Sequence, residues 1–538
     1  RLCTLVERPT TRRYGSVYVG EPSDVRGLTF DVVFVVGVAE KVFPKKVAHD
    51  PIFPDKTRAK VDSSLETNAV RTANERLALR LAVGAATRRL VVSYPRLDSD
   101  LARPRTPSFY ALELLRAAEG RLPGFEELAR RAEVVGGARI GWPAPRSRED
   151  AVDETEHDLA LLETVFAKNE ADTTGMARFL LSANAYLARA LRSRALRWQK
   201  GWSYADGLVL AKQPIEARAA LDHHLFANRS YSPTALQNFS ACPYKFVLQA
   251  IFRLSPQEEK EQIEELDPLQ RGSLLHEIEF ELHVRLRELG LLPITPSNLE
   301  RAREVLDEVV QREAEKVKDD LAPAIPAVWD DGIRALAADA REMLRRASLE
   351  NEWVPSHFEL SFGLKDRRAQ DPLSQDEPVK VAGGLQLRGS IDVVDKDARG
   401  DLRATDYKTG KVRADKDMRI GGGETLQPVF YALVLEQLMP KAKPMGGRLY
   451  YCTAAGGYTE VDVPLDDEAR EGAGAVVKLV GDALTHGFLP AAPNTAKDAY
   501  GCEWCDYLPI CGPYEEHRTS KVKSQKELGP LVQIRKRR

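Results

Sequence analysis

The chain has 538 residues, of which 43% are hydrophobic and 29% are charged, and its formal net charge is −2. This length allows three or four domains, each with its own core, and the composition is ordinary for a soluble globular protein. A nearly neutral chain has no global positive field, so any binding of nucleic acid must depend on local basic surfaces. No apolar run is long enough to span a bilayer and no signal peptide opens the chain, so we expect an intracellular protein without a membrane partner.

The N-terminal part predicts strands and a helix in alternation. Residues 16–44 contain two apolar, β-branched segments around a polar turn, which are typical of buried parallel strands. Residues 66–90 have helical spacing and lead into a further apolar segment at 90–95. The order strand, helix, strand predicts a doubly wound α/β sheet. Because the first residue is Arg1 and not Met, we expect the chain to be a piece of a longer polypeptide.

Residues 116–228 predict a helical connector with no visible chemistry of its own. They are rich in Ala, Leu, Arg and Glu, and helical spacing recurs at 125–133, 158–168 and 183–199. At the other end of the chain, basic residues recur between positions 521 and 538. We expect that run to be a disordered, solubilising tail.

Two segments in the C-terminal half predict a β-hairpin that carries two acids and a lysine. Residues 385–394 contain Asp392, and residues 402–408 contain Asp406 and Lys408, whose spacing of two places both side chains on one face of the strand. Two carboxylates that converge on a hard cation beside an ammonium suit metal-assisted phosphodiester hydrolysis. A surface ion pair would explain the same residues without any chemistry.

Two amphipathic helices flank this hairpin in the sequence. Residues 270–289 have helical periodicity and place His276 in the first turns. Residues 426–438 predict a second helix, in which Gln427 and Tyr431 are four positions apart and therefore share a face. Taken alone, His276 is better explained as a core histidine than as a ligand.

Three of the six cysteines form a cluster with the spacing Cys502-x-x-Cys505-x5-Cys511, and Cys242 lies far upstream. Thiolates at such spacing can bind one centre, and soft sulfur ligands select zinc or an iron–sulfur cluster. Spacing alone favours zinc, because C-x2-C zinc sites are common. Cys3 and Cys452 do not fit this pattern, and we expect them to be packed as buried hydrophobic residues.

Five elements in chain order resemble the RecB-type branch of the PD-(D/E)XK nuclease superfamily. They extend over about 160 residues. They are Gly272-x-x-x-His276, Glu359, Gly389-Ser-Ile-Asp392, Asp406-Tyr-Lys408 and Gln427-x-x-x-Tyr431. The resemblance implies a central mixed sheet flanked by helices, within a domain that we place at residues 229–538.

The resemblance also implies residue roles. Mg²⁺ or Mn²⁺ would be held by His276, Asp392, Asp406 and the backbone carbonyl of Tyr407. The catalytic lysine would be Lys408.

Further residues would support that site. Gln427 and Tyr431 would support the site and the DNA backbone, and Glu359 would be a further motif acid, although a surface carboxylate is an alternative for it. Lys411 and Arg413 follow the hairpin directly, and we expect them to contact DNA phosphates.

The cysteine pattern resembles that of AddB-like subunits of bacterial helicase–nucleases, which have one cysteine before the nuclease core and three after it. In that family the four bind a 4Fe–4S cluster that staples the two ends of the nuclease domain. The resemblance therefore favours a 4Fe–4S cluster on Cys242, Cys502, Cys505 and Cys511, with Zn²⁺ as the alternative.

Residues 1–115 are similar to the second motor domain of superfamily 1 helicases. Segment 26–31 resembles a motif that reads nucleotide state, and segment 85–88 resembles one whose arginine, here Arg88, reaches the γ-phosphate. An acid of the first motif is replaced by Thr29, and no G-x-x-x-x-G-K-[ST] phosphate loop occurs in the chain. Nucleotide binding by these residues is therefore a weak expectation.

Together these features predict a metal-dependent DNA exonuclease that processes double-strand break ends within an ATP-dependent helicase–nuclease. Its expected partners are DNA single strands from duplex ends and an AddA-like subunit, in the bacterial cytoplasm. One alternative is a standalone RecB-family single-strand exonuclease. The other is a catalytically inert scaffold subunit that binds DNA.

Overall fold

The computed structural model describes most of the chain, in ranges interrupted by short gaps. These ranges are 17–47, 50, 53–98, 103–136, 142, 144–167, 170–210, 215–256, 263, 265–350, 352–365, 371–495, 501–502, 505–512 and 515–538. The chain divides into two compact units, one of residues 1–99 and 103–144 and the other of residues 100–102 and 145–538. The division into three domains stays a prediction. Among the described residues, no helix is both long and apolar enough to cross a membrane.

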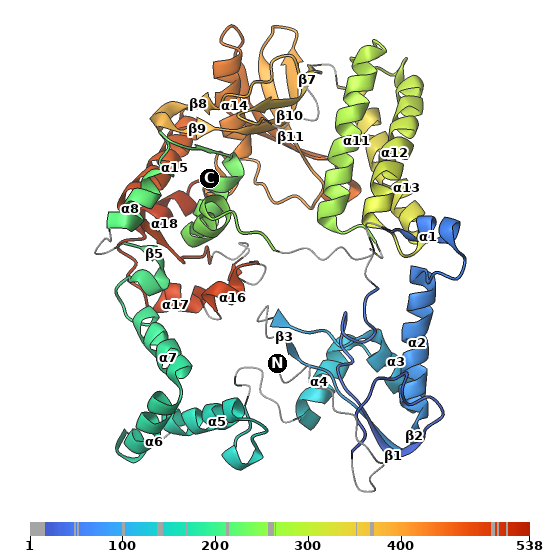
Figure 1. Cartoon of the computed structure of the whole chain (residues 1–538). Coiled ribbons are helices and arrows are strands. Elements are labelled where there is room, and N and C mark those ends of the chain that lie inside the picture. The colour runs from blue at the N-terminus through green and yellow to red at the C-terminus, as the bar shows by residue number, and fades with distance from the viewer. Residues whose placement is uncertain are drawn as a thin grey trace. The chain divides into compact units, whose positions relative to one another are not determined.

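The first unit contains two parallel strands connected through two helices, coloured blue in Figure 1. Its elements are β1 (Phe30–Val35), α1 (Asp55–Val61), α2 (Asn68–Gly84), β2 (Ala86–Val92), β3 (Leu97–Asp98), β4 (Arg103–Pro104), α3 (Phe109–Glu119) and α4 (Phe125–Gly136). The order strand, helix, strand agrees with the expectation for this part of the chain, and the described sheet has two strands.

Two details of the N-terminal prediction are wrong. Residues 17–20 form no strand, because no neighbouring segment pairs with them in the described structure. The helix expected to extend to residue 90 ends at Gly84, and Arg88 lies on β2 instead of at a helix end. Backbone pairing of β2 with β1, including Leu90 with Val33, outweighs the helical spacing of this segment.

The second unit begins with helices, as predicted for the connector. Its elements before the central sheet are α5 (Glu154–Ala167), α6 (Glu170–Ala183), α7 (Ala185–Arg197), β5 (Gly207–Val209), α8 (Ile215–Asp222), β6 (Ser230–Tyr231), α9 (Pro233–Ala241), α10 (Pro243–Phe246), a π-helical turn (Val247–Ile251), α11 (Pro268–Glu288), α12 (Leu299–Leu321) and α13 (Pro326–Ala347). Asn184 caps α7 by accepting a hydrogen bond from the backbone nitrogen of Leu187 at 2.9 Å.

A mixed five-stranded sheet with the order β13-β12-β11-β10-β7 forms the centre of this unit. The strands are β7 (Trp353–Phe362), β10 (Gly389–Asp397), β11 (Leu402–Lys408), β12 (Pro444–Tyr451) and β13 (Thr459–Pro464). All neighbours are antiparallel except β11 and β12, which are parallel and connected through α14 (Gln427–Leu438). The predicted hairpin is confirmed as β10 and β11, and the predicted helices as α11 and α14. Short strands β8 (Val379–Lys380), β9 (Gln386–Leu387) and β14 (Phe488–Pro490) complete the sheet elements.

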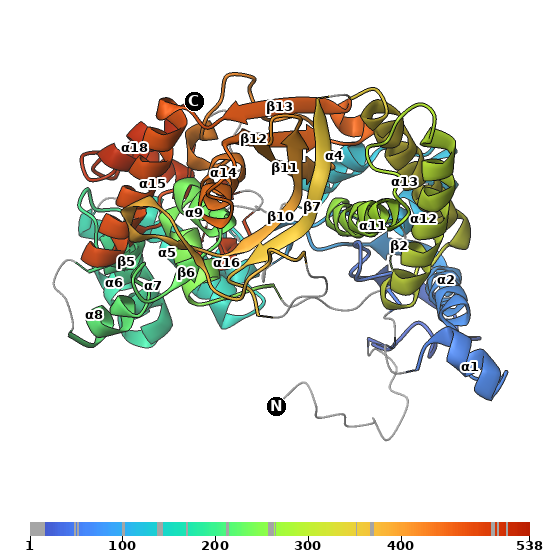
Figure 2. The same ribbon diagram turned by 90° about the horizontal axis from the view of Figure 1, so that it is seen from above.

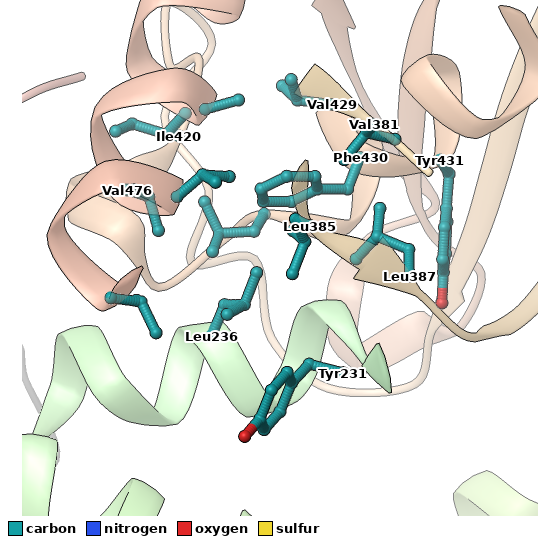
Figure 3. Close-up of a cluster of buried hydrophobic side chains, with 14 of the residues drawn as sticks. Tyr231, Leu236, Val381, Leu385, Leu387, Ile420, Val429, Phe430, Tyr431 and Val476 are labelled. Atoms are coloured by element: carbon teal, nitrogen blue, oxygen red, sulfur yellow. The ribbon is translucent and has the colours of Figure 1, made fainter. Parts of the chain in front are cut away.

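Helices cover both faces of the central sheet, as Figure 2 shows. One face packs against α11, α12 and α13 through a core that includes Leu275, Ile278 and Val393. The other face packs against α14 and α15 (Asp467–His486) through a second core with Phe430 at its centre (Figure 3). Phe430 is completely buried, as expected for a core residue on α14. Burial of two separate apolar layers fixes the sheet between its helices.

The C-terminal segment is folded, so the expectation of a disordered tail is wrong. It forms α16 (Leu508–Cys511), α17 (Glu515–Lys521) and α18 (Gly529–Arg535). Leu531 and Ile534 of α18 are buried in the second core. The backbone oxygen of Arg538 accepts a hydrogen bond from the Ile420 nitrogen at 2.8 Å. Apolar residues interleaved with the basic ones anchor this segment.

Close packing of α14 against β12 depends on Gly447. A Cβ atom at this position would lie 2.5 Å from both the Cα and the carbonyl oxygen of Pro428, in the first turn of α14. We expect Gly447→Ala to lower the free energy of unfolding by about 1–3 kcal/mol, because neither backbone can yield without shifting the helix. The matched control is Gly474→Ala on α15, where a Cβ meets nothing within 4 Å. That change should be neutral or stabilising by up to about 1 kcal/mol. Equal denaturation midpoints for the two variants would contradict this account.

Candidate active site

Asp392 and Asp406 are neighbours because the hairpin opens at its end. The backbone pairing of β10 and β11 stops at Val393 and Thr405, so the next row contains Asp392 and Asp406. There the strands part, and Asp392 Oδ2 accepts a hydrogen bond from the backbone nitrogen of Tyr407 at 2.9 Å. Asp406 is buried, with 3% of its surface exposed. The end of this ladder therefore brings two carboxylates together in a partly enclosed position.

Glu359 joins the same row from the other side. On β7, the residues on either side of Glu359 pair with those on either side of Asp392. Glu359 has a φ of 47°, a left-handed conformation that is strained for a non-glycine residue. The Ser390 hydroxyl donates a hydrogen bond to Glu359 Oε2 at 2.6 Å. The strained backbone and this bond hold the third carboxylate beside the other two.

His276 reaches the acids from α11. The N-terminus of that helix is fixed by a capping box between Asp267 and Gln270. His276 Nδ1 lies 3.5 Å from Asp392 Oδ2. Burial lowers the pKa of His276, although the charge of Asp406 acts in the opposite direction. A neutral imidazole is the form that binds a metal ion.

Lys408, Gln427 and Asp406 form a closed group. Lys408 Nζ makes an ion pair with Asp406 Oδ2 and donates a hydrogen bond to Gln427 Oε1 at 3.1 Å. The amide nitrogen of Gln427 donates to Asp406 Oδ1 at 2.9 Å. Burial acts against the ammonium form of Lys408, but the adjacent Asp406 carboxylate outweighs it and raises the lysine pKa. Lys408 is therefore protonated at neutral pH and held in one position.

The carboxylates of this row repel one another. Burial raises the pKa of Asp392 well above its usual value, and the charges of Asp406 and Glu359 raise it further. The negative charge of Asp406 is offset by the Lys408 ammonium, which pairs with its Oδ2 atom. Within the described residues, no three His, Cys, Asp or Glu side chains are arranged so that they could hold a metal ion in this structure. The donor set is nevertheless one that a divalent cation suits, because such an ion would offset the mutual repulsion.

Of the other predicted residues, Tyr431 and Tyr407 lie beside this group. Tyr431 is buried on α14, and burial followed by the charge of Asp406 raises its pKa. The Tyr407 side chain belongs to the core on the α11 face, so only its backbone is directed toward the acids. Lys411 and Arg413 are exposed in the loop after β11, and Arg88 is exposed in the first unit.

The four predicted cysteine ligands line one cavity of about 70 Å³. Cys242 caps the C-terminus of α9, Cys502 and Cys505 precede α16, and Cys511 is the last residue of α16. Burial and the proximity of Cys242 raise the pKa of the Cys511 thiol to about 12. Cys452 is buried in the core as expected, whereas Cys3 lies outside the described residues.

Glu279 is a buried acid that the sequence did not single out. It lies on α11, three residues after His276, with 2% of its surface exposed. Neither of its carboxylate oxygens has a hydrogen-bond partner in the described structure. Burial raises its pKa to about 8, so the group is largely neutral at physiological pH. A Glu within a charged helix resembles a solvated residue in the sequence, which explains why it was missed.

Comparison with known proteins gives a family match for this unit. Residues 230–512, more than half of the chain, match the model of the PD-(D/E)XK nuclease superfamily. This agrees with the resemblance inferred from the sequence motifs.

Relatives of named function extend the similarity, and each is a subunit of an ATP-dependent helicase/deoxyribonuclease. The chain is 26% identical over 448 residues to the protein from Moorella thermoacetica, covering 78% of this chain and 35% of the relative. It is 24% identical over 462 residues to the protein of the same name from Symbiobacterium thermophilum, covering 81% and 37%. It is 22% identical over 574 residues to that of Carboxydothermus hydrogenoformans, covering 92% and 48%. The chain thus spans between about a third and a half of the length of these relatives, and the predicted kinship with AddB-like subunits is confirmed.

The raised pKa of Glu279 predicts a pH-dependent stability. The folded chain keeps a proton on Glu279 up to a pH of about 8, whereas an unfolded glutamate loses it near pH ~4.3. The contribution of Glu279 to the free energy of unfolding is therefore fully present below the pKa of the unfolded state. It is lost as the pH rises through this window, by a few kcal/mol at most. We expect Glu279→Gln to remove this slope, measured as the difference in unfolding free energy between pH 5 and pH 8. Parallel pH profiles for the variant and the wild type would refute the buried, neutral state of Glu279.

Proposed function

Because the chain belongs to the PD-(D/E)XK nuclease superfamily, we propose that residues 229–538 hydrolyse phosphodiester bonds of DNA with the help of a divalent metal ion. The observation that carries this proposal is the row of Glu359, Asp392 and Asp406 with Lys408 bonded at its edge. A solvated strand face would not bring three acids together in this way. Their mutual repulsion has a clear use only if a cation is bound there.

The chain's own residues supply the rest of the chemistry. Mg²⁺ or Mn²⁺, held by His276, Asp392, Asp406 and the carbonyl of Tyr407, would polarise the phosphate and lower the pKa of a water molecule. Lys408 is protonated, so it acts as a donor to the attacking water or to the phosphate and does not accept the proton. Gln427 keeps this ammonium directed at the reacting atoms.

Neighbouring side chains orient these groups. Ser390 holds Glu359 beside the acids. Tyr431 is buried on α14 within electrostatic reach of Asp406 and would support the site. Lys411 and Arg413, exposed after β11, are suited to bind the phosphates of the incoming strand.

We further propose that the nuclease works as an exonuclease on single strands from duplex ends during double-strand break repair, within an ATP-dependent helicase–nuclease in the bacterial cytoplasm. The function named for the relatives supports this assignment over a standalone exonuclease. The acids and Lys408 argue against an inert scaffold. An AddA-like subunit would then supply the motor, and any nucleotide contact made by residues 1–115 would involve Arg88.

The cysteine cavity is proposed to hold a 4Fe–4S cluster. Four soft donors line it, and Cys242 and Cys502 come from the two ends of the segment that contains the acids. One ligand before the acids and three after them is the arrangement that the resemblance to AddB-like subunits associates with a cluster. Zn²⁺ is the alternative, because the same four donors would also suit a tetrahedral ion.

The nuclease assignment is tested by cleavage of labelled single-stranded DNA with Mg²⁺ or Mn²⁺. Asp406→Asn and Lys408→Met should each lower the rate by at least about 10²-fold, because each removes a charge at the reacting centre. Lys396→Met, an exposed lysine elsewhere on β10, is the matched control and should leave the rate unchanged. If wild type and all variants are equally inactive with both ions, the proposal is wrong.

The cluster assignment is tested separately on protein purified without oxygen. We expect a brown protein with broad visible absorption and with iron and acid-labile sulfide in equal amounts. Cys505→Ala should lose this absorption. If the wild type is colourless and contains zinc, the cluster assignment is wrong and the site binds Zn²⁺.

A further inference from the structure

Two buried carboxylates and three cations form a network beside the cysteine cavity. Arg518 makes ion pairs with Asp206 and with Glu515. Lys523 Nζ lies 2.8 Å from Asp206 Oδ2, and Arg197 pairs with Glu515. The side chains of the two acids, Arg518 and Lys523 are at most 1% exposed. A network this deep in the protein is sensitive to any imbalance of charge.

The network attaches the connector to the end of the chain. Arg518 Nη1 donates a hydrogen bond to the carbonyl of Arg197 at 2.9 Å, and Trp202 Nε1 donates to the carbonyl of Ser524 at 3.0 Å. All four residues lie outside the segment 230–512 that matches the nuclease family. The cysteine site is therefore bounded by residues that the family match does not cover.

Among the three cations of the network, Arg197 has the fewest ion-pair and hydrogen-bond partners in the described structure. Three cations share two carboxylates, and Arg197 Nε is buried without a hydrogen-bond partner in the described structure. Its guanidinium lies against the turn after Cys511, where a Cβ atom on Gly512 would be 3.9 Å from Nη1. Burial, followed by repulsion from Arg518, lowers the pKa of Arg197. The Arg197 side chain is 22% exposed, so this excess charge is only partly buried, and a nearby anion would stabilise it.

Arg535 provides a second cation near Cys242. Its guanidinium donates hydrogen bonds only to backbone carbonyls among its described bonds, namely those of Ser240, Ala241, Ala492 and Pro493. It lies within electrostatic reach of Cys242 and of the Glu424 carboxylate. Glu516 has the opposite electrostatic effect, because its negative carboxylate accepts a hydrogen bond from the backbone nitrogen of Cys502 and, in addition to burial, raises the pKa of that thiol.

We infer that Arg197 is a positioning residue of the cysteine-bound centre, and that its partly buried charge offsets the negative charge of the sulfur ligands at Cys511. Arg535 has the same role at Cys242. Cysteines bound to iron or zinc are thiolates, so four of them give the centre a net negative charge. This inference rests on the proposed centre, and it predicts that the connector sets how readily that centre is reduced.

The test uses the full 538-residue chain, purified without oxygen. The reduced centre carries one more negative charge, so removal of the Arg197 cation disfavours it. Arg197→Met should lower the equilibrium constant for one-electron reduction about tenfold, a shift of about 59 mV to more negative potential. Arg197→Lys should restore most of it, and Arg192→Met, which removes an exposed cation from the same helix, should leave it unchanged. If the centre is zinc, Arg197→Met should instead speed its transfer to a chelator about tenfold.

Each outcome is decisive. Equal potentials, or equal rates of zinc transfer, for Arg197→Met and Arg192→Met overturn the inference, as does a wild type that binds neither iron nor zinc. If Arg197→Met fails to fold because Glu515 loses a partner, the double variant Arg197→Met with Glu515→Gln removes the pair and is compared with Glu515→Gln alone. DNA cleavage by the same wild-type preparation is measured independently. Its absence rejects the nuclease while the potentials still decide the role of Arg197.

Discussion

Mutual repulsion between Asp392 and Asp406 is the constraint around which the second unit is built. Two carboxylates in one row at the end of a ladder would ordinarily separate, but the backbone nitrogen of Tyr407 fixes one and Gln427 fixes the other. The strands that carry them are themselves fixed between two apolar layers. The protein thus stores an unfavourable charge arrangement, which remains in place because packing elsewhere outweighs it.

The second unit has two places where like charges are crowded together, negative charges in one and positive charges in the other. At the end of β10 and β11, acids crowd together beside a single ammonium. Near the cysteine cavity, the guanidinium groups of Arg197 and Arg535 lie within electrostatic reach of Cys511 and Cys242. Each excess is chemically sensible if a centre of opposite charge is bound, a cation in the first place and a thiolate-ligated centre in the second. Both proposed sites are thus accompanied by a charge imbalance among the chain's own side chains.

Local pattern predicts the elements of the second unit well. The hairpin, α11 and α14 follow from periodicity, and the order of the motifs indicates the acids, Lys408 and Gln427. Long-range pairing is not contained in such a pattern. Arg518 and Asp206 are 312 positions apart, so nothing in either neighbourhood indicates the ion pair. Similarly, the strand at 86–92 competes with a helical pattern, and only pairing with β1 decides it. The basic run at the C-terminus has the composition of a disordered segment, and its charges outnumber the two apolar residues, Leu531 and Ile534, that anchor it.

The two faces of the sheet pack against different helices, and this determines when the side chains around the acids come together during folding. His276 belongs to a helix packed by one core, whereas Gln427 belongs to a helix packed by the other. A chain in which only one layer has condensed lacks either the imidazole or the amide at the acids. If the acids hydrolyse DNA as proposed, that reaction requires both layers to be formed.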